Sequence, residues 1–297
     1  RGFPFSRTRE KVPEGRMRAR PPQQHVSPQQ TPPIHAPVDR AFVAWNPAHA
    51  RAPTLRRFVQ AFSSRDALPA TMPGPLASAL LALPDRYNIG ARKPAAVLYV
   101  DDAHGDDAVR VDEFTWGLVP KWSKEPQTKY TTVTARLERA PRSRIFRGPW
   151  EKRRCVIPMN GYYKWDRSAK PAVPYFIQAR DGRALFAAGL WERWEQGDAS
   201  LLSFAVLTHP NPAIPAPLVP DGPVFLPHAQ WSRWATDAPW FPMRTLTTMK
   251  QPELEAYRVS RAIRNPALDD YTLLEPADAG APDEPLADGD TDDWDED

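Results

Sequence analysis

The side chains that most often carry catalysis are sparse in this sequence of 297 residues. Its single cysteine, Cys155, lies in an apolar run that predicts a strand, so we interpret it as a small core residue rather than a nucleophile. The six histidines are scattered, and only His209 and His228 lie in the predicted core. No cluster has metal-ligand spacing, and the sequence contains no phosphate loop or Ser–His–Asp arrangement. We therefore expect no metal and no cofactor.

Basic side chains are the most evident means of binding a ligand. Residues 1–54 carry nine basic and three acidic groups, residues 276–297 carry ten acidic and no basic groups, and the segment between them has a net charge of +7. A basic body with an acidic tail is typical of a protein that binds a polyanion such as nucleic acid.

The cysteine count and the hydropathy pattern bear on the compartment. One cysteine rules out an internal disulfide and fits a reducing environment. No run of 18 apolar residues predicts a membrane span, and no apolar segment follows the basic N-terminal residues as a secretory signal would. We expect a cytoplasmic protein.

Composition divides the chain into three parts. Residues 1–53 contain ten prolines and few aliphatic side chains, so they bury too little surface to offset the entropy of ordering. Residues 277–297 form an acidic tail in which like charges repel one another. We expect both ends to be disordered, around one domain over residues 54–276.

The middle of the chain has the patterns of a sheet with few helices. Apolar or alternating runs predict strands over 95–100, 109–116, 174–179, 184–190, 201–208 and 223–226, and helical spacing predicts helices over 75–83, 136–146 and 228–235. The pair Asp181-Gly182 predicts a hairpin between the two strands beside it. These elements indicate an α+β fold dominated by antiparallel sheet.

The same segment contains eight unusual local strings. They are residues 86–89, 116–122, 134–138 with 143–146, 153–158, 161–165, 186–194, 207–212 and 259–261. In this order and spacing they resemble the SOS response-associated peptidase (SRAP) family, over about residues 54–276. The resemblance implies a single SRAP-type domain with a mainly antiparallel, barrel-like sheet and flanking helices. It also implies a protein that senses abasic sites in single-stranded DNA and shields them by a covalent protein–DNA link.

The resemblance places the family's catalytic positions on four residues that have other side chains here. The family's N-terminal cysteine, whose amine and thiol form a thiazolidine with the abasic aldehyde, aligns with Leu55, behind 54 residues. Its asparagine aligns with Thr134, its glutamate with Lys164 and its histidine with Val219. Such a reaction needs a nucleophile and acid–base groups within hydrogen-bond reach, so we expect that the family's covalent chemistry is lost.

The positions that the family uses for DNA are better preserved. They are Arg57, Arg136 and Glu138 together with the loop residues Trp116, Pro120, Lys121 and Trp122. The two arginines resemble phosphate contacts, and the loop resembles the one against which bases stack. The alternatives are a helix-face charge for Arg136 and a core position for Trp116.

Three functions stay open on the sequence alone. The first is a monomeric protein that binds single-stranded or abasic DNA without the thiazolidine link. The second is an enzyme that processes abasic sites with substitute groups, as a crosslinking protein, a lyase or a self-processing peptidase. The third is a decayed copy or a scaffold that recruits partners through its ends. Affinity for single-stranded DNA separates the third from the others, and covalent capture of abasic DNA separates the first two.

Two features lead to more specific hypotheses. The amine of Lys164 can condense with an abasic aldehyde to a Schiff base and promote elimination, although an ordinary lysine is mostly protonated at neutral pH. The alternative is a phosphate-binding or solvent-exposed lysine. Residues 288–297 combine seven acids with Trp294, so they could compete with DNA for a basic groove. The alternative is a tail that only improves solubility.

Overall fold

The computed structural model describes residues 55–101, 108–127, 132–236 and 241–277. The expected N-terminal extension and the acidic residues after 277 lie outside these ranges, and so does the predicted competition of residues 288–297 with DNA. None of the helices in the described ranges is long and apolar enough to cross a membrane.

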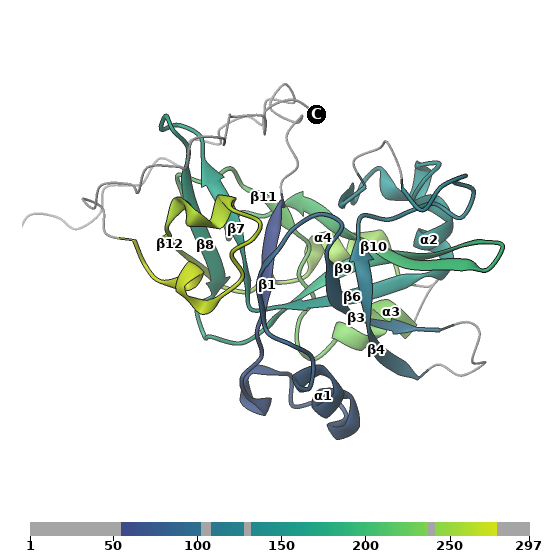
Figure 1. Cartoon of the computed structure of the whole chain (residues 1–297). Helices are drawn as coiled ribbons and strands as arrows, with labels where there is room; N and C mark the ends of the chain where they lie inside the picture. The colour runs from purple at the N-terminus through teal and green to yellow at the C-terminus, as the bar shows by residue number, and fades with distance from the viewer. Residues whose placement is uncertain (1–54, 102–107, 128–131, 237–240, 278–297) are drawn as a thin grey trace, which may run out of the picture. The chain divides into compact units, whose positions relative to one another are not determined.

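The first of two sheets is entirely antiparallel (Figure 1). It is built from β1 (Arg57–Gln60), β2 (Arg86–Ile89), β7 (Gly161–Asp166), β8 (Val173–Ala179) and β12 (Leu254–Arg258). Its strands lie in the order β12–β8–β7–β1–β2.

The second sheet closes on itself. It is built from β3 (Pro94–Val100), β4 (Val109–Trp116), β5 (Thr134–Arg136), β6 (Arg154–Met159), β9 (Leu185–Gln196), β10 (Ala199–Pro210) and β11 (Asp221–Pro223). The strands β10, β4, β3, β6 and β9 pair in this order and β9 pairs again with β10, so they form a five-stranded barrel. β5 and β11 pair with β10 outside this ring. Only the pairings of β10 with β4 and β5 are parallel among the described strands, which confirms the expected α+β fold with a mainly antiparallel, barrel-like sheet.

Short helices cover the outer faces of the sheets. The α-helices are α1 (Gly74–Leu81), α2 (Arg147–Lys152), α3 (Trp231–Thr236) and α4 (Met243–Thr248), and the 3₁₀-helices are η2 (Arg65–Ala67), η4 (Ala140–Arg142), η5 (Arg261–Arg264) and η6 (Tyr271–Leu274). The four α-helices share one apolar core with outward-facing barrel residues such as Val156 and Leu190. The helices η5 and η6 pack with Tyr163 and Phe176 on the first sheet.

A second core fills the barrel and continues onto the first sheet. Phe114 and Trp191 belong to barrel strands, whereas Phe58 and Tyr162 come from β1 and β7, and all four share this core. Because both faces of β6 are covered, all six of its residues are buried, including the charged Arg154 at its start. Cys155 is fully buried there and burial raises its pKa, which confirms its interpretation as a core residue.

The predicted hairpin at Asp181-Gly182 is wrong. The local turn forms, since the Gly182 amide donates to the Ala179 oxygen at 3.0 Å and the φ of Gly182 is +71°. However, β8 before the turn pairs with β7 and β12, whereas β9 after it pairs with β6 and β10. The turn therefore crosses between sheets, because turn chemistry determines a chain reversal but not the partner of the next strand. β9 instead forms a hairpin with the strand that follows it, β10, around Gly197.

The predicted helix over 136–146 is also wrong. Arg136 ends β5, the helical segment after it is only the short η4, and α2 begins at Arg147. Pro141 lies inside the predicted span and lacks the N–H that a continuous helix needs, which accounts for the short turns. The other two predicted helices form as α1 and α3 with shifted ends.

Candidate nucleic-acid interface

Lys164 lies in β7 with its side chain turned into the protein. Only 7% of its surface is exposed, and its Nζ donates a hydrogen bond to the backbone oxygen of Asp221 at 2.7 Å. Burial lowers the pKa of Lys164 from 10.5 to about 8; the charge of Asp221 opposes this change, and the charges of Arg136 and Arg167 add to it. The structure thus holds an amine that loses its proton near pH 8.

Asp221, at the start of β11, supplies the negative charge beside this amine. It is completely buried, and its Oδ1 accepts a hydrogen bond and an ion pair from the guanidinium of Arg136. Its Oδ2 has no hydrogen-bond partner among the described residues, and the same holds for the buried hydroxyl of Tyr162. Burial and the charge of Asp221 raise the pKa of Tyr162, so its hydroxyl stays protonated. Two buried polar atoms of this kind favour a water molecule or a polar ligand group.

Strands from both sheets bring these groups together. β10 pairs on one side with β5, where Thr208 lies opposite Arg136, and on the other side with β11, where Pro210 lies opposite Asp221. Lys164 comes from β7 of the first sheet, 57 residues before Asp221 in the chain. The four residues Arg136, Tyr162, Lys164 and Asp221, which we call the Lys164 site, therefore lie where the two sheets meet.

An exposed acid–base pair follows in the chain after Arg136. The carboxylate of Glu138 pairs with Nδ1 of His209, which lies on β10 opposite Gly222. Half of the Glu138 side chain is exposed. The structure thus places Glu138 at the surface, two residues from the Lys164 site.

Trp116 and Trp122, which the sequence places in one DNA-binding segment, have different environments at the end of β4 and in the loop that follows it. Trp122 is 45% exposed and the guanidinium carbon of Arg144 lies 4.6 Å from its ring centroid. Lys121 beside it is exposed, whereas Pro120 is buried. Trp122 thus offers a ring surface with positive charge close to it.

Trp116 has the opposite environment. It is completely buried, with Phe58 edge-on at a centroid distance of 4.9 Å and Phe204 stacked at 6.4 Å, and its Nε1 donates to the Val133 oxygen at 2.8 Å. No base can stack on Trp116 in this conformation, so the alternative of a core position applies.

The other residues that the sequence singled out lie in different environments. Two are buried in the interior, and two lie close in the chain to residues of the Lys164 site. Leu55 is completely buried in the core around the barrel. Arg57 is also buried: its guanidinium donates to Asn88 Oδ1 at 2.8 Å and to the Arg264 oxygen at 3.2 Å, and burial lowers its pKa. These bonds direct its guanidinium to acceptors within the protein. Thr134 is half-buried on β5, two residues before Arg136, and Val219 is exposed, two residues before Asp221.

Asp221, Tyr162 and Arg144 were missed as site residues from the sequence. An Asp-Gly pair such as Asp221-Gly222 is typical of a turn, and a Tyr-Tyr pair is typical of a core. No local pattern marks Asp221 as buried, because its position depends on the pairing of β11 with β10.

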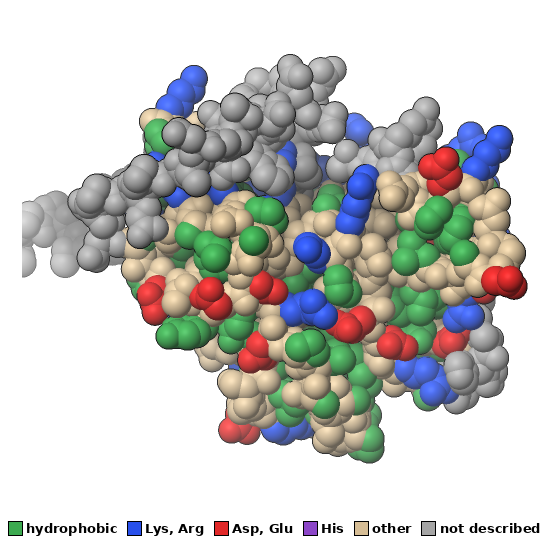
Figure 2. Space-filling model, in the orientation of Figure 1, with side chains coloured by type: hydrophobic (Ala, Val, Ile, Leu, Met, Phe, Trp, Pro, Cys, Tyr) green, Lys and Arg blue, Asp and Glu red, His purple; other side chains and the backbone are tan. Residues whose placement is uncertain are grey.

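Exposed arginines continue from the Lys164 site toward α2. They are Arg139, Arg142 and Arg144 in the segment before this helix and Arg147, its first residue. Figure 2 shows Lys and Arg side chains, with an acidic side chain beside them, at the upper right of this face. This segment therefore adds positive charge between the Lys164 site and Trp122.

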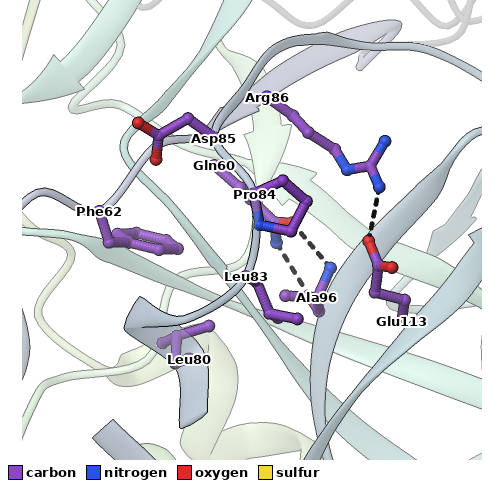
Figure 3. Close-up of a pocket in the computed structure, with 9 residues that line it drawn as sticks. All are labelled: Gln60, Phe62, Leu80, Leu83, Pro84, Asp85, Arg86, Ala96 and Glu113. Carbon is purple, nitrogen blue, oxygen red and sulfur yellow. Dashed lines mark hydrogen bonds and ion pairs between the residues drawn. The ribbon is translucent and has the colours of Figure 1, made fainter. Parts of the chain in front are cut away.

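A separate surface hollow is lined by residues of α1 and of the strands β1 to β4 (Figure 3). Its volume is about 10 Å³, which is enough for about one water molecule and too small for a sugar. The Gln60 amide bonds both to Ala96 and to the Pro158 oxygen, and Arg86 pairs with Glu113 at 2.7 Å. These contacts join strands, so we assign the hollow a structural role. No group of three or more His, Cys, Asp or Glu among the described residues is placed to hold a metal ion.

The pKa of Lys164 predicts how stability depends on pH. In the unfolded chain this lysine keeps its proton up to 10.5, whereas in the folded protein it loses the proton near 8. The unfolded state therefore binds more protons between these values, and stability rises with pH there by about 2 kcal/mol from pH 7 to pH 9.5. Urea denaturation of the native chain and of Lys164→Met at both pH values measures this, because other titrating groups cancel in the difference. Parallel changes in the two proteins would contradict the assignment.

Comparisons with known proteins agree with the resemblance in the sequence. A family model described as SOS response associated peptidase (SRAP) matches residues 56–266. The abasic site processing protein YMR114C of Saccharomyces cerevisiae is 38% identical over 42% of this chain, an alignment that spans only 33% of the yeast protein. The abasic site processing protein YoaM of Bacillus subtilis is 29% identical over 64% of this chain and 84% of its own length.

A solved structure supports the same fold. A crystal structure of a Bacteroides thetaiotaomicron protein has 19% sequence identity and a TM-score of 0.58, over 74% of this chain and 99% of that one. The family model spans both sheets, from β1 to η5, and includes every residue of the Lys164 site. The chain therefore belongs to the SOS response associated peptidase (SRAP) family.

Proposed function

We propose that this protein binds single-stranded DNA, including abasic sites, without forming the thiazolidine link that the family resemblance implies. The relatives named above are abasic site processing proteins, which supports the substrate class. One observation carries the proposal. The segment from Arg136 to Arg144 connects the Lys164 site to the exposed ring of Trp122.

This segment combines the two means by which proteins hold single strands. Guanidinium groups bind phosphates through bidentate hydrogen bonds, and exposed aromatic rings stack on bases of any sequence. Arg144 lies over one face of Trp122, so a base can stack on the other face, with the ring between the base and the guanidinium. The expected binding is therefore tolerant of sequence and sensitive to salt.

The absence of a usable thiol supports the non-thiazolidine part of the proposal. Leu55 has no thiol and is completely buried, and Cys155 is buried with a raised pKa, which opposes thiolate formation. We also propose a monomeric, cytoplasmic protein whose binding domain spans residues 54–276.

Binding of a fluorescent single-stranded oligonucleotide, measured by anisotropy over a salt series, tests this function. Trp122→Ala is expected to weaken binding by about 5- to 150-fold, because one stacked base contributes about 1–3 kcal/mol. Arg136→Gln is expected to reduce the slope of log K against log salt by about 0.7, because one phosphate contact is lost.

Two variants serve as matched controls. Tyr271 is an exposed ring on η6, and Arg183 is an exposed arginine near Asp181, so Tyr271→Ala and Arg183→Gln should both bind as the native chain does. A stable adduct on a denaturing gel without reductant would contradict the non-thiazolidine part. No binding at low salt would reject the function in favour of a decayed copy or a scaffold.

A further inference from the structure

We propose that Lys164 and Asp221 form a lyase centre, in which the lysine amine condenses with the aldehyde of an abasic sugar and the aspartate promotes release of the 3′ strand. This inference rests on the proposed function, because it requires abasic DNA to reach the Lys164 site. It assigns an enzymatic activity in which the reactive group is an amine rather than a cysteine.

The first support is the polar surface buried around the amine. The backbone oxygen of Asp221 holds Nζ at 2.7 Å, and the carboxylate of the same residue keeps Oδ2 without a partner among the described residues. The hydroxyl of Tyr162 is likewise unpartnered, and a Cβ on Gly222 would lie 3.1 Å from it. A purely structural ion pair would satisfy these atoms, whereas a sugar with hydroxyl groups and an acidic C–H could use both.

The second support is the order of charges from the interior to the surface. Lys164 is 7% exposed and Asp221 is completely buried, whereas a quarter of the Arg136 side chain is exposed. Arg167, whose charge acts on Lys164, is exposed just beyond the end of β7. A phosphate entering from solvent would meet these guanidinium groups while its sugar approaches the amine.

The protonation state of the amine agrees with this role. With a pKa of about 8, about a fifth of the Lys164 side chains are neutral at pH 7.4, against fewer than about one in a thousand for an ordinary lysine. Arg136 and Arg167 favour the neutral amine and Asp221 opposes it, and the hydroxyl of Tyr162 stays protonated. The nucleophile is therefore available without a metal or a separate base.

The reaction balances with water alone. The neutral Nζ adds to C1′ of the open-chain sugar, one proton is taken up from solvent and the former aldehyde oxygen leaves as water, which gives a protonated imine. Asp221 Oδ2 takes a proton from C2′, the electron pair forms the C2′–C3′ double bond, and the C3′–O bond breaks. The leaving oxygen departs on the 5′-phosphate of the next nucleotide, and Arg136 stabilises its charge. Addition of one water to the protonated imine then frees the neutral lysine, releases an unsaturated aldehyde and returns the proton of the imine to solvent. Asp221 also gives its proton to solvent.

The test uses the whole chain with a single-stranded oligonucleotide that contains one abasic site. Borohydride reduces the imine, so the native chain should give a trapped protein–DNA band, and without reductant it should cleave the strand at the abasic site. Lys164→Arg keeps the positive charge but lacks the reactive amine, and should lose both the band and the cleavage. Lys93→Arg, at an exposed lysine outside the site, should keep both. The trapping rate of the native chain should rise with pH, with a midpoint near 8.

Asp221→Asn separates the two steps. It should still give the trapped band, whereas cleavage should fall by about 100-fold or more because the base at C2′ is lost. Circular dichroism should be used to check that this variant is folded under the assay conditions. If it is not folded, the loss of trapping and cleavage in Lys164→Arg tests the proposed lyase centre.

The outcomes distinguish this inference from the proposed function. A band that persists in Lys164→Arg assigns the amine to another residue and overturns the inference. Anisotropy that shows binding while the native chain gives no band overturns the inference and leaves the proposed function intact. Absence of both binding and trapping overturns both.

Discussion

Asp221→Asn is expected to lower the free energy of unfolding by about 3–5 kcal/mol near pH 7. The variant keeps the shape of the side chain and the backbone oxygen that accepts from Lys164, but it removes the negative charge that faces Arg136 and Lys164. A buried lysine would then remain without the charge that opposes the loss of its proton. Urea denaturation followed by circular dichroism measures the change.

The pH dependence identifies the cause of this loss. At pH 9.5 Lys164 is neutral in the folded protein, so Asp221→Asn should cost less there than at pH 7. The double variant with Lys164→Met should recover part of the loss, since the buried cation is then absent. Asp181→Asn is the matched control: its carboxylate is exposed and 4.0 Å from Arg183, and its loss should change stability by less than about 1 kcal/mol. If Asp221→Asn lowered the free energy of unfolding equally at both pH values, the buried charge of Lys164 would not be the cause of the loss.

The sequence predicted the positions of the strands better than the pairing between strands. Alternation in residues 109–116 predicts β4 with its observed ends, because one face is covered and the other is partly open. Pairing depends instead on contacts between distant residues. The turn at Asp181-Gly182 is correct locally, yet the flanking strands enter different sheets. Closure of the barrel, which requires β10 to pair with the distant strand β4, likewise has no local signal in the sequence.

The sequence directs attention to some residues of the candidate site, but it does not give their environment. The family resemblance directs attention to Lys164 and Arg136, which the structure brings together through Asp221. It does not give exposure, so it grouped the buried Arg57 with the partly exposed Arg136. The exposure of a side chain depends on how both sheets pack. Asp221 contacts Lys164 only because β11, 57 residues later in the chain, is brought to it by the fold.

Trp116→Ala is expected to destabilise the fold by about 3–5 kcal/mol, because it removes a fully buried indole and leaves a cavity. The ring packs between Phe58 of the first sheet and Phe204 of the barrel, so its loss weakens the contact between the two sheets. It also leaves the Val133 oxygen without its donor. Thermal and urea denaturation should both report the change.

Trp122→Ala is the matched substitution within the same string of residues. Its ring is 45% exposed and contacts Arg144, so the free energy of unfolding should fall by no more than about 1 kcal/mol. The effects on DNA affinity should be the reverse of the effects on stability. At a temperature where both variants are folded, Trp122→Ala should bind DNA weakly, whereas Trp116→Ala should bind it nearly as the native chain does. If Trp116→Ala were stable but lost its DNA affinity, the buried ring would have to leave the core on binding, and the division of this string into one core and one binding tryptophan would be wrong.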